Sequence, residues 1–316
     1  MEYNIKSFKK QNFLRRLTMP LPELEAYFRE KRNANRDKEI KHIHLHRIFS
    51  KFFIFILGIN RLFSGQNYKI VSDKRVKNGK ARIYTCTHVG GDDVLFVYEA
   101  YKDQSYWFWG DVGYRYRTID YLLVTLNGTI EVDTWDKTDR RNARNTAIKV
   151  LKKHGNILIF PEGTWNITEN KPVMNLYTGA AEMAIESGAD IIPLAVERYG
   201  DTWFINIGEN ISSEKYDPDM KRELTDDLRD AMATLKWEIF EKYGHICRDE
   251  LPDNASEQWL ANIQKMCIAT KFPMEDVVRT IYVTKEDKEQ REVQEAMEHL
   301  IPSRANAFLF SKRNHD

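Results

Sequence analysis

The sequence predicts an α/β protein whose mixed, mostly parallel sheet is flanked by helices. Two observations carry this prediction: short apolar runs of strand type alternate with amphipathic helical segments, and several of these runs end in glycine-containing turns. Polar sequence of helical type stands on either side of the alternation. We therefore expect an N-terminal interfacial helical segment (1–65), the α/β domain itself (66–212) and a helical C-terminal extension (213–316).

Composition excludes several classes of function. A formal net charge of +1 over 316 residues provides no overall field that would attract nucleic acid. The three cysteines, Cys86, Cys247 and Cys267, are far apart and form no C-x-x-C pair. We therefore expect neither a metal site nor a disulfide framework, and a reducing cytoplasmic setting.

The N-terminal region is predicted to be helical. Apolar side chains recur at helical spacing in residues 21–32, at Leu24, Tyr27 and Phe28, and a second helix is expected to begin near Asp37. This second helix leads into the most apolar stretch of the chain.

That stretch, residues 48–59, is expected to lie in a membrane interface. Its charge-free run, Phe52–Asn60, has nine residues, too few for a helix to cross a bilayer, which takes about 20. The flanking cations Arg47, Lys51 and Arg61 suit contact with anionic headgroups. An ordinary core helix is the alternative.

The alternation of elements fills the middle of the chain. Strands are expected at 68–71, 82–86, 106–109, 128–133, 157–160, 190–196 and 203–207. Helices are expected between them at 92–102, 119–126, 139–153 and 179–187. After residue 217 only helices are expected, at 220–243, 256–269 and 286–300.

The candidate catalytic residues lie in the turn that follows the strand at 82–86. His88 stands at the carboxyl end of that strand, where open α/β sheets hold their ligands. Asp93 lies in the first turn of the next helix, close enough to accept a hydrogen bond from one imidazole nitrogen and leave the other free as a base. The structural alternative is a local hydrogen bond by His88, with Asp92 or Asp93 only capping the helix.

Four motifs stand in order along the predicted domain: His88-x4-Asp93, Gly-Thr-Ile-Glu-Val-Asp at 128–133, Phe-Pro-Glu-Gly-Thr at 160–164, and Ile-Ile-Pro-Leu at 191–194. Together they resemble the four sequence blocks of the glycerolipid acyltransferase family, which includes bacterial lysophosphatidate acyltransferases. The resemblance covers about residues 83–196. The helices before it are similar to the membrane-associating leader of the bacterial members.

The resemblance implies an enzyme of phospholipid and lipid biosynthesis on the cytoplasmic face of the membrane. Such an enzyme moves a fatty acyl group from the thioester of acyl-CoA or acyl carrier protein to an acceptor hydroxyl, without a cofactor. His88 would be the general base and Asp93 would hold its tautomer. The acceptor would attack the thioester directly, an inference that the lack of a G-x-S-x-G elbow supports, and Cys86 has no separate base. The implied partners are the thioester donor, the acceptor, the membrane surface and the carrier protein, with no nucleic acid.

The other blocks are expected to bind substrate. Backbone N–H groups in the turn at 162–164 are candidates to stabilise the oxyanion or to bind polar groups of the acceptor, although Glu162 alternatively only fixes that turn. The expected substrate-binding residues are Gly128, Thr134, Glu162, Gly163, Thr164 and Trp165.

The acceptor stays open, because the sequence departs from the family pattern. Thr134 and Trp165 stand where members that use glycerol phosphate commonly carry arginines for the phosphate, and Asp111 stands near the usual place of a lysine. Neither Thr nor Trp replaces a bidentate arginine. A lysophosphatidate acceptor and a non-phosphate acceptor (a glycolipid, an amino-acid-derived lipid or an amine) are both compatible. The cations that could rebuild the pocket are Arg115, Arg117, Arg140, Arg141 and Arg144.

Two other classes of function remain as alternatives. One is a non-catalytic lipid-binding protein that has kept the fold, and the other is a hydrolase that uses the His–Asp pair to activate water. A hydrolase would release thiol without an acceptor, an acyltransferase only with one, and a lipid-binding protein would release none.

Overall fold

The sheet has seven strands in a single layer. The computed structural model describes residues 10–282 except 36–38, 111–112, 168–170, 245–249, 251 and 271. The strands are β1 (Asn67–Asp73), β2 (Arg82–Cys86), β3 (Ser105–Gly110), β4 (Thr129–Val132), β5 (Asn156–Ile159), β6 (Asp190–Tyr199) and β7 (Thr202–Ile207). Their order is β1-β7-β6-β2-β5-β3-β4. All neighbours are parallel except the β6–β7 hairpin, so the predicted mixed, mostly parallel sheet is confirmed.

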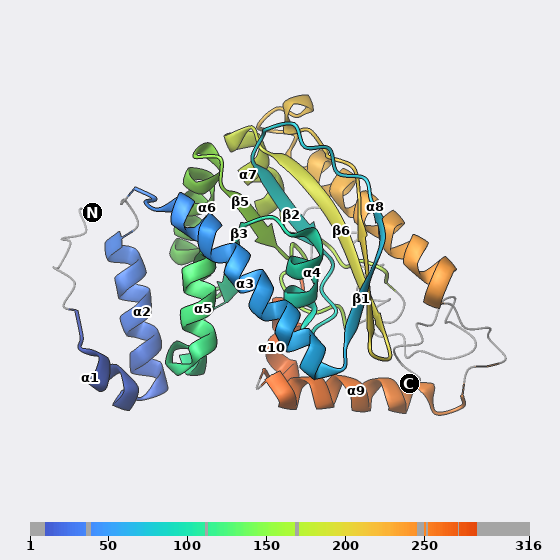
Figure 1. Cartoon of the computed structure of the whole chain (residues 1–316), viewed down its shortest axis with the longest axis horizontal. Coiled ribbons are helices and arrows are strands. Elements are labelled where there is room, and N and C mark those ends of the chain that lie inside the picture. Colours follow the sequence, from blue (N-terminus) through green and yellow to red (C-terminus); the bar gives the residue numbers. More distant parts are fainter. Residues whose placement is uncertain are drawn as a thin grey trace.

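Helices cover both faces of this sheet. They are α1 (Phe13–Thr18), α2 (Leu21–Asn35), α3 (Ile43–Ser64), α4 (Asp93–Tyr101), α5 (Ile119–Asn127), α6 (Lys137–Lys152), α7 (Gly179–Ser187), α8 (Lys221–Ile239), α9 (Ala255–Thr270) and α10 (Met274–Thr280). Side chains of α3, α4 and α5 pack on one face and those of α6, α7 and α8 on the other. Figure 1 shows α3 running diagonally across the first of these faces.

The two cores explain why the central strands carry apolar residues continuously. On β2, Ile83 packs into the core beneath α6 and α7, while its neighbour Tyr84 packs into the core beneath α3 and α4. All five residues of β2 are buried. Alternate residues of a strand point to opposite faces, so a strand covered on both sides needs apolar residues at every position.

Helix α3 differs from its prediction. It begins at Ile43 rather than near Asp37, which lies outside the described residues. At 22 residues it is long and apolar enough to cross a membrane by length and composition, so the prediction that this segment is too short is wrong. The prediction counted only the run between two cations, whereas the helix continues through them. Core helices of soluble proteins pass the same test, and α3 packs Ser50, Phe53 and Leu57 against the domain.

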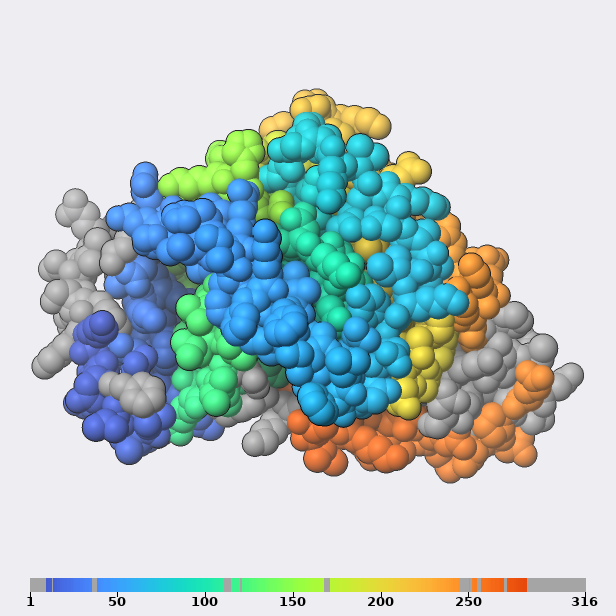
Figure 2. Space-filling model, in the orientation of Figure 1, coloured from blue at the N-terminus to red at the C-terminus, as the bar shows by residue number. Residues whose placement is uncertain are grey.

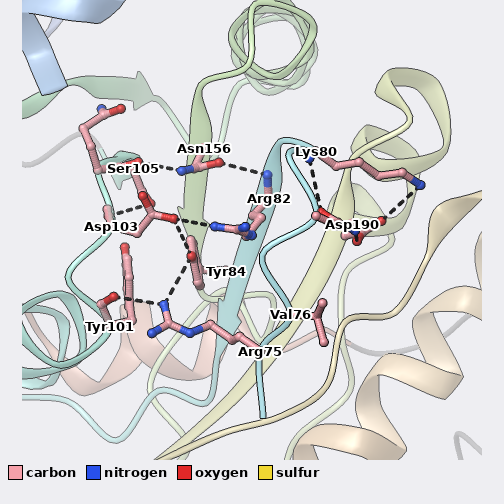
Figure 3. Close-up of polar contacts among 12 residues, drawn as sticks. Arg75, Val76, Lys80, Arg82, Tyr84, Tyr101, Asp103, Ser105, Asn156 and Asp190 are labelled. Carbon is pink, nitrogen blue, oxygen red and sulfur yellow. Dashed lines mark hydrogen bonds and ion pairs between the residues drawn. The ribbon is translucent and has the colours of Figure 1, made fainter. Parts of the chain in front are cut away.

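Polar side chains join the amino ends of the strands, at the edge of the sheet opposite to His88 (Figure 3). Asp103 accepts hydrogen bonds from Arg82 at 2.9 Å and from the Tyr84 hydroxyl at 2.7 Å. Asn156, which opens β5, accepts from the Arg82 backbone N–H at 3.0 Å and donates to the Gln104 carbonyl at 3.0 Å. These bonds satisfy strand-end groups that would otherwise be buried without partners. The polar side chains at the amino ends of the strands therefore stabilise the fold.

Helix α8, the first part of the C-terminal region, belongs to the core of the domain. Its apolar side chains pack beneath β6 and β7, together with α6 and α7. Lys236 of α8 is 3% exposed and lies 3.0 Å from the carboxylate of Glu197 on β6, which is fully buried. The helix is thus held by a buried ion pair as well as by apolar contacts. The helix predicted at 286–300 lies outside the described residues.

Removing one partner of this ion pair is expected to destabilise the protein. Lys236→Met should lower the free energy of unfolding by about 3–5 kcal/mol, because it leaves the buried carboxylate of Glu197 without its cation. Urea unfolding followed by circular dichroism measures the change. The double variant Glu197→Gln/Lys236→Met should recover part of the loss. A single variant as stable as the wild type would contradict this account.

Candidate active site

The carboxylate of Asp93 organises the turn after β2. One oxygen, Oδ2, accepts hydrogen bonds from His88 Nδ1 at 2.8 Å, from the Val89 N–H at 2.9 Å and from the Gly90 N–H at 3.0 Å. The Asp93 side chain is fully buried, whereas His88 keeps 17% of its side chain exposed. The bond to Nδ1 places that nitrogen's proton against Asp93 and leaves Nε2 as the basic nitrogen.

Glycine is required at position 90. Its φ of +91° lies in the left-handed region, which residues with a side chain rarely adopt. A Cβ atom there would lie 2.2 Å from the sulfur of Met266 on α9. The turn therefore has its shape because the backbone N–H groups must reach Asp93 while α9 packs directly against the outside of the loop.

Glu162 fixes the backbone of His88. Its carboxylate accepts from the His88 N–H at 2.9 Å and from the Met174 N–H at 2.8 Å, and the His88 carbonyl accepts from the Asn166 N–H at 2.7 Å. Glu162 is fully buried. Burial raises its pKa, and the two backbone hydrogen bonds oppose that rise. The alternative that Glu162 serves to fix its surroundings therefore agrees with its contacts.

A cavity of about 1290 Å³ lies along this edge of the sheet, and His88 is part of its wall. On the side of α3 and α5 the wall is apolar, with Phe53, Leu57, Trp107 and Val124. On the side of α6 the wall carries arginines. The space therefore joins an apolar end and a cationic end with an imidazole in the same wall.

The expected substrate-binding residues divide into three groups. Thr134, Gly163 and Trp165 line the cavity. Glu162 and Thr164 are buried and are not part of its wall. Gly128 ends α5 at the amino end of β4, where it faces the ring of Tyr106, so the structure does not bring it to the cavity.

Several cavity residues come from parts of the chain that carry no recognisable functional motif. Tyr177 precedes α7, and Arg279 and Thr280 belong to α10. Trp165 packs edge-on against Phe272, with ring centroids 5.5 Å apart, and also faces His88 at 6.3 Å. No motif spacing relates α10 to His88, because the two meet only through the folding of the C-terminal region.

Cys86 is the one nucleophilic side chain of β2, two residues before His88. It is completely buried, and burial together with the negative charge of Asp93 holds its pKa well above the ordinary value. A thiol that stays protonated is a poor nucleophile, so Cys86 acts as a small apolar core residue.

The sequence of residues 67–197 matches the acyltransferase family model. These residues form an acyltransferase domain. The resemblance inferred from the four motifs is therefore confirmed, and the protein is an enzyme that transfers acyl groups. Helices α8, α9 and α10 lie beyond the matched residues.

Comparison of structures agrees with this assignment. The acyltransferase is similar to the 1-acyl-sn-glycerophosphate (LPA) acyltransferase PlsC from Thermotoga maritima, with a TM-score of 0.53 and 12% sequence identity. The likeness covers 73% of this chain and 98% of that chain. At 12% identity this likeness shows a shared fold. No curated protein matches the sequence.

The buried Glu162 predicts a pH dependence of stability. Because its pKa is raised in the folded state, the folded protein holds this proton more tightly than the unfolded chain, and the free energy of unfolding falls as pH rises above the ordinary value of 4.5. Urea unfolding between about pH 4 and pH 8 tests this. Relative to Glu162→Gln, which cannot ionise, the wild type should lose stability as pH rises. The exposed Glu223→Gln is the control, and a gain in relative stability with pH would contradict the assignment.

Proposed function

We propose that this acyltransferase moves a fatty acyl group from an acyl-CoA or acyl-carrier-protein thioester to an acceptor hydroxyl, with lysophosphatidate as the model acceptor, at the cytoplasmic face of a membrane. The observation that carries the proposal is the hydrogen bond between His88 Nδ1 and the buried carboxylate of Asp93, in a side chain that lines a cavity with an apolar end. No cofactor is needed for this reaction, since the thioester is already activated.

In the proposed reaction His88 acts as general base. Nε2 takes the proton of the acceptor hydroxyl while the oxygen attacks the thioester carbonyl, and the tetrahedral intermediate collapses with cleavage of the C–S bond. The departing sulfur takes the proton from the imidazolium. Asp93 stabilises the imidazolium because its carboxylate is fixed by the two backbone N–H groups of Val89 and Gly90 as well as by His88.

The developing oxyanion needs hydrogen-bond donors near His88. The Gly163 N–H already donates to the Phe160 carbonyl at 3.0 Å, so it is engaged within its own turn. Among the described residues, the backbone N–H groups of Glu162 and Thr164 have no acceptor. Because Glu162 is fully buried, we assign the oxyanion contact to the Thr164 amide, which lies between the cavity residues Gly163 and Trp165.

Helix α3 provides the surface for the proposed membrane contact. Its exposed apolar residues recur every three or four positions and form one stripe: Leu45, Ile48, Phe52, Phe55, Ile59 and Leu62. This stripe faces away from the side that packs on the domain, and α3 lies open over much of the molecule in Figure 2. The neighbouring α5 exposes Ile119, Leu122 and Leu126. Two of the expected headgroup cations are engaged with the protein, since Arg47 donates to the His154 carbonyl and Arg61 pairs with Glu99 at 3.0 Å.

The acceptor is not defined by the family's usual positions. Thr134 and Trp165 line the cavity but supply no cation, and Trp165 is packed against Phe272. A phosphate pocket of the usual kind is therefore lacking at these two positions. This leaves a non-phosphate acceptor as the second candidate, unless other residues of the same cavity bind the anion.

Loss of the His–Asp pair should abolish turnover. With palmitoyl-CoA and lysophosphatidate, His88→Ala should lower kcat by about 10²–10⁴-fold because the general base is gone. Asp93→Asn should also lower it by at least about 10²-fold, since an amide cannot hold the same tautomer or balance the imidazolium. Release of free thiol and formation of the acylated product are measured together. Thiol release without any acceptor would indicate a hydrolase, and full activity of His88→Ala would refute the role of the pair.

Membrane binding should depend on the exposed stripe of α3. The triple variant Ile48→Ser/Phe55→Ser/Leu62→Ser is expected to weaken binding to phosphatidylglycerol-containing vesicles by at least about tenfold, because each apolar side chain gains about 1.5–3 kcal/mol when fully buried. Vesicle co-sedimentation measures the binding. Val76→Ser, at an exposed site away from α3, is the control. If the triple variant binds vesicles as well as the wild type does, the membrane contact does not lie on this stripe of α3.

A further inference from the structure

We propose that Arg140, Arg141 and Arg279 form an anion-binding subsite for the headgroup of the lipid acceptor, and that the C-terminal region thereby completes the active site. The inference deepens the proposed acyl transfer and rests on it. It names the acceptor as a lipid with a phosphate or carboxylate headgroup, and it assigns the binding to residues other than Thr134 and Trp165.

The first argument is the charge of the cavity wall. Its charged residues are the arginines Arg115, Arg140, Arg141, Arg144 and Arg279 and the acids Asp92 and Glu182. Five cations against two anions leave a formal excess of three positive charges in the wall. A concave site with such an excess concentrates anions, because its low-dielectric walls focus the field.

The second argument is which of these arginines are available. Arg144 is neutralised locally, since it pairs with Glu182 at 2.5 Å, and Lys221 pairs with the same carboxylate at 3.0 Å. Arg140 donates to the Thr134 carbonyl, and neither Arg140 nor Arg141 makes an ion pair with any residue in the described part of the chain. Both are exposed side chains that line the cavity.

The position of Arg140 and Arg141 gives the helix no benefit. They lie near the amino end of α6, where the helix dipole favours anions rather than cations. The capping of this end is supplied by Asp136, whose side chain accepts from the Asp139 N–H at 2.7 Å. The two cations therefore add to the positive potential of the cavity wall, at an end of α6 where the helix dipole does not stabilise them.

The third argument is how α10 brings in Arg279. The hydroxyl of Tyr177 donates to the Thr280 carbonyl at 2.9 Å, and Val277 is completely buried, so the helix is anchored beside the cavity. Arg279 lies over the ring of Trp135 with its guanidinium carbon 4.5 Å from the ring centroid. Its Nη1 also lies 3.6 Å from Asp276 Oδ1 in an exposed, solvent-screened ion pair, and the remaining N–H groups at the edge of the guanidinium can bind an anion.

The three arginines thus come from both sides of the turn after β4. Arg140 and Arg141 belong to α6, which follows β4, and Trp135 beneath Arg279 belongs to the turn itself. His88 and the three arginines line the same cavity. An amphiphilic acceptor in this cavity can meet the arginines with its anionic group and His88 with its hydroxyl.

Kinetics with matched acceptors test the subsite. Palmitoyl-CoA is the donor, and 1-oleoyl-lysophosphatidate is compared with 1-monooleoylglycerol, which lacks only the phosphate. Arg279→Ala and Arg140→Ala/Arg141→Ala should each raise the KM for lysophosphatidate by at least about tenfold, as expected for loss of charge-assisted hydrogen bonds. The KM values for monooleoylglycerol and palmitoyl-CoA should change less than about twofold. Lys137→Ala, on an exposed site of α6 outside the cavity, is the matched control.

Three kinetic outcomes would overturn the proposal. A rise in the KM for palmitoyl-CoA alone would assign the arginines to the donor. An equal loss of kcat with both acceptors would make them structural. A wild type that uses monooleoylglycerol as well as lysophosphatidate, with acyl transfer itself intact, would show that no headgroup anion is recognised.

A binding measurement separates this proposal from the proposed reaction. In the full chain carrying His88→Ala, lysophosphatidate should change the tryptophan fluorescence, and the part due to Trp135 is given by the difference from the same protein with Trp135→Phe, because Trp107, Trp109 and Trp165 also line the cavity. Arg279→Ala should weaken the affinity measured from this signal at least about tenfold. Such binding, together with a wild type that transfers no acyl group to any acceptor, would support the subsite while refuting the reaction. Inorganic phosphate that saturates the same signal with equal affinity would refute a lipid headgroup site, as would an equal response to monooleoylglycerol.

Discussion

Burying a carboxylate costs much free energy unless it is hydrogen-bonded, and Asp93 meets this constraint because its Oδ2 accepts three hydrogen bonds. The same hydrogen bonds determine the structure of the turn around Asp93. Satisfying Asp93 forces Gly90 into the left-handed region, starts α4 at this point and fixes the tautomer of His88. Glu162 applies the same constraint to the backbone, since its carboxylate joins the His88 strand end to the segment at Met174. The imidazole and the backbone of His88 are thus each held by a buried carboxyl side chain.

The side chains at the amino ends of the strands differ in role from those at the carboxyl ends. At the amino ends of the strands, Asp103, Arg82 and Asn156 pair with one another and leave the edge closed. At the carboxyl ends the side chains line a cavity, and the polar groups that hold the loops lie behind its wall. The hydrogen bonds that close the amino ends of the strands and the side chains that line the cavity therefore lie at opposite ends of the strands. The lining residues can change while those hydrogen bonds stay intact.

The sequence predicted most of the frame because its signals are local. Periodicity placed every strand of the sheet, and the turn chemistry at His88 and Glu162 placed the residues that organise the site. Local signals fail where partners are distant in sequence. The start of α3 at Ile43, the contact of Arg61 with Glu99 and the presence of α10 beside Tyr177 are decided by tertiary packing. Gly128 is the converse case, because its motif marks the start of a strand and the structure does not bring it to the cavity.

The cavity wall includes Phe53 on α3, which precedes the first strand, and Thr280 on α10, near the end of the described residues. During synthesis the His88–Asp93 pair is complete long before α10 has left the ribosome. A nascent chain, or one cut by a protease after α8, would hold His88 and Asp93 beside a cavity that lacks the part of its wall supplied by Arg279 and Thr280. Under the proposed reaction, water would then compete with the acceptor for the thioester, and α10 would limit this hydrolysis only once it has packed in place.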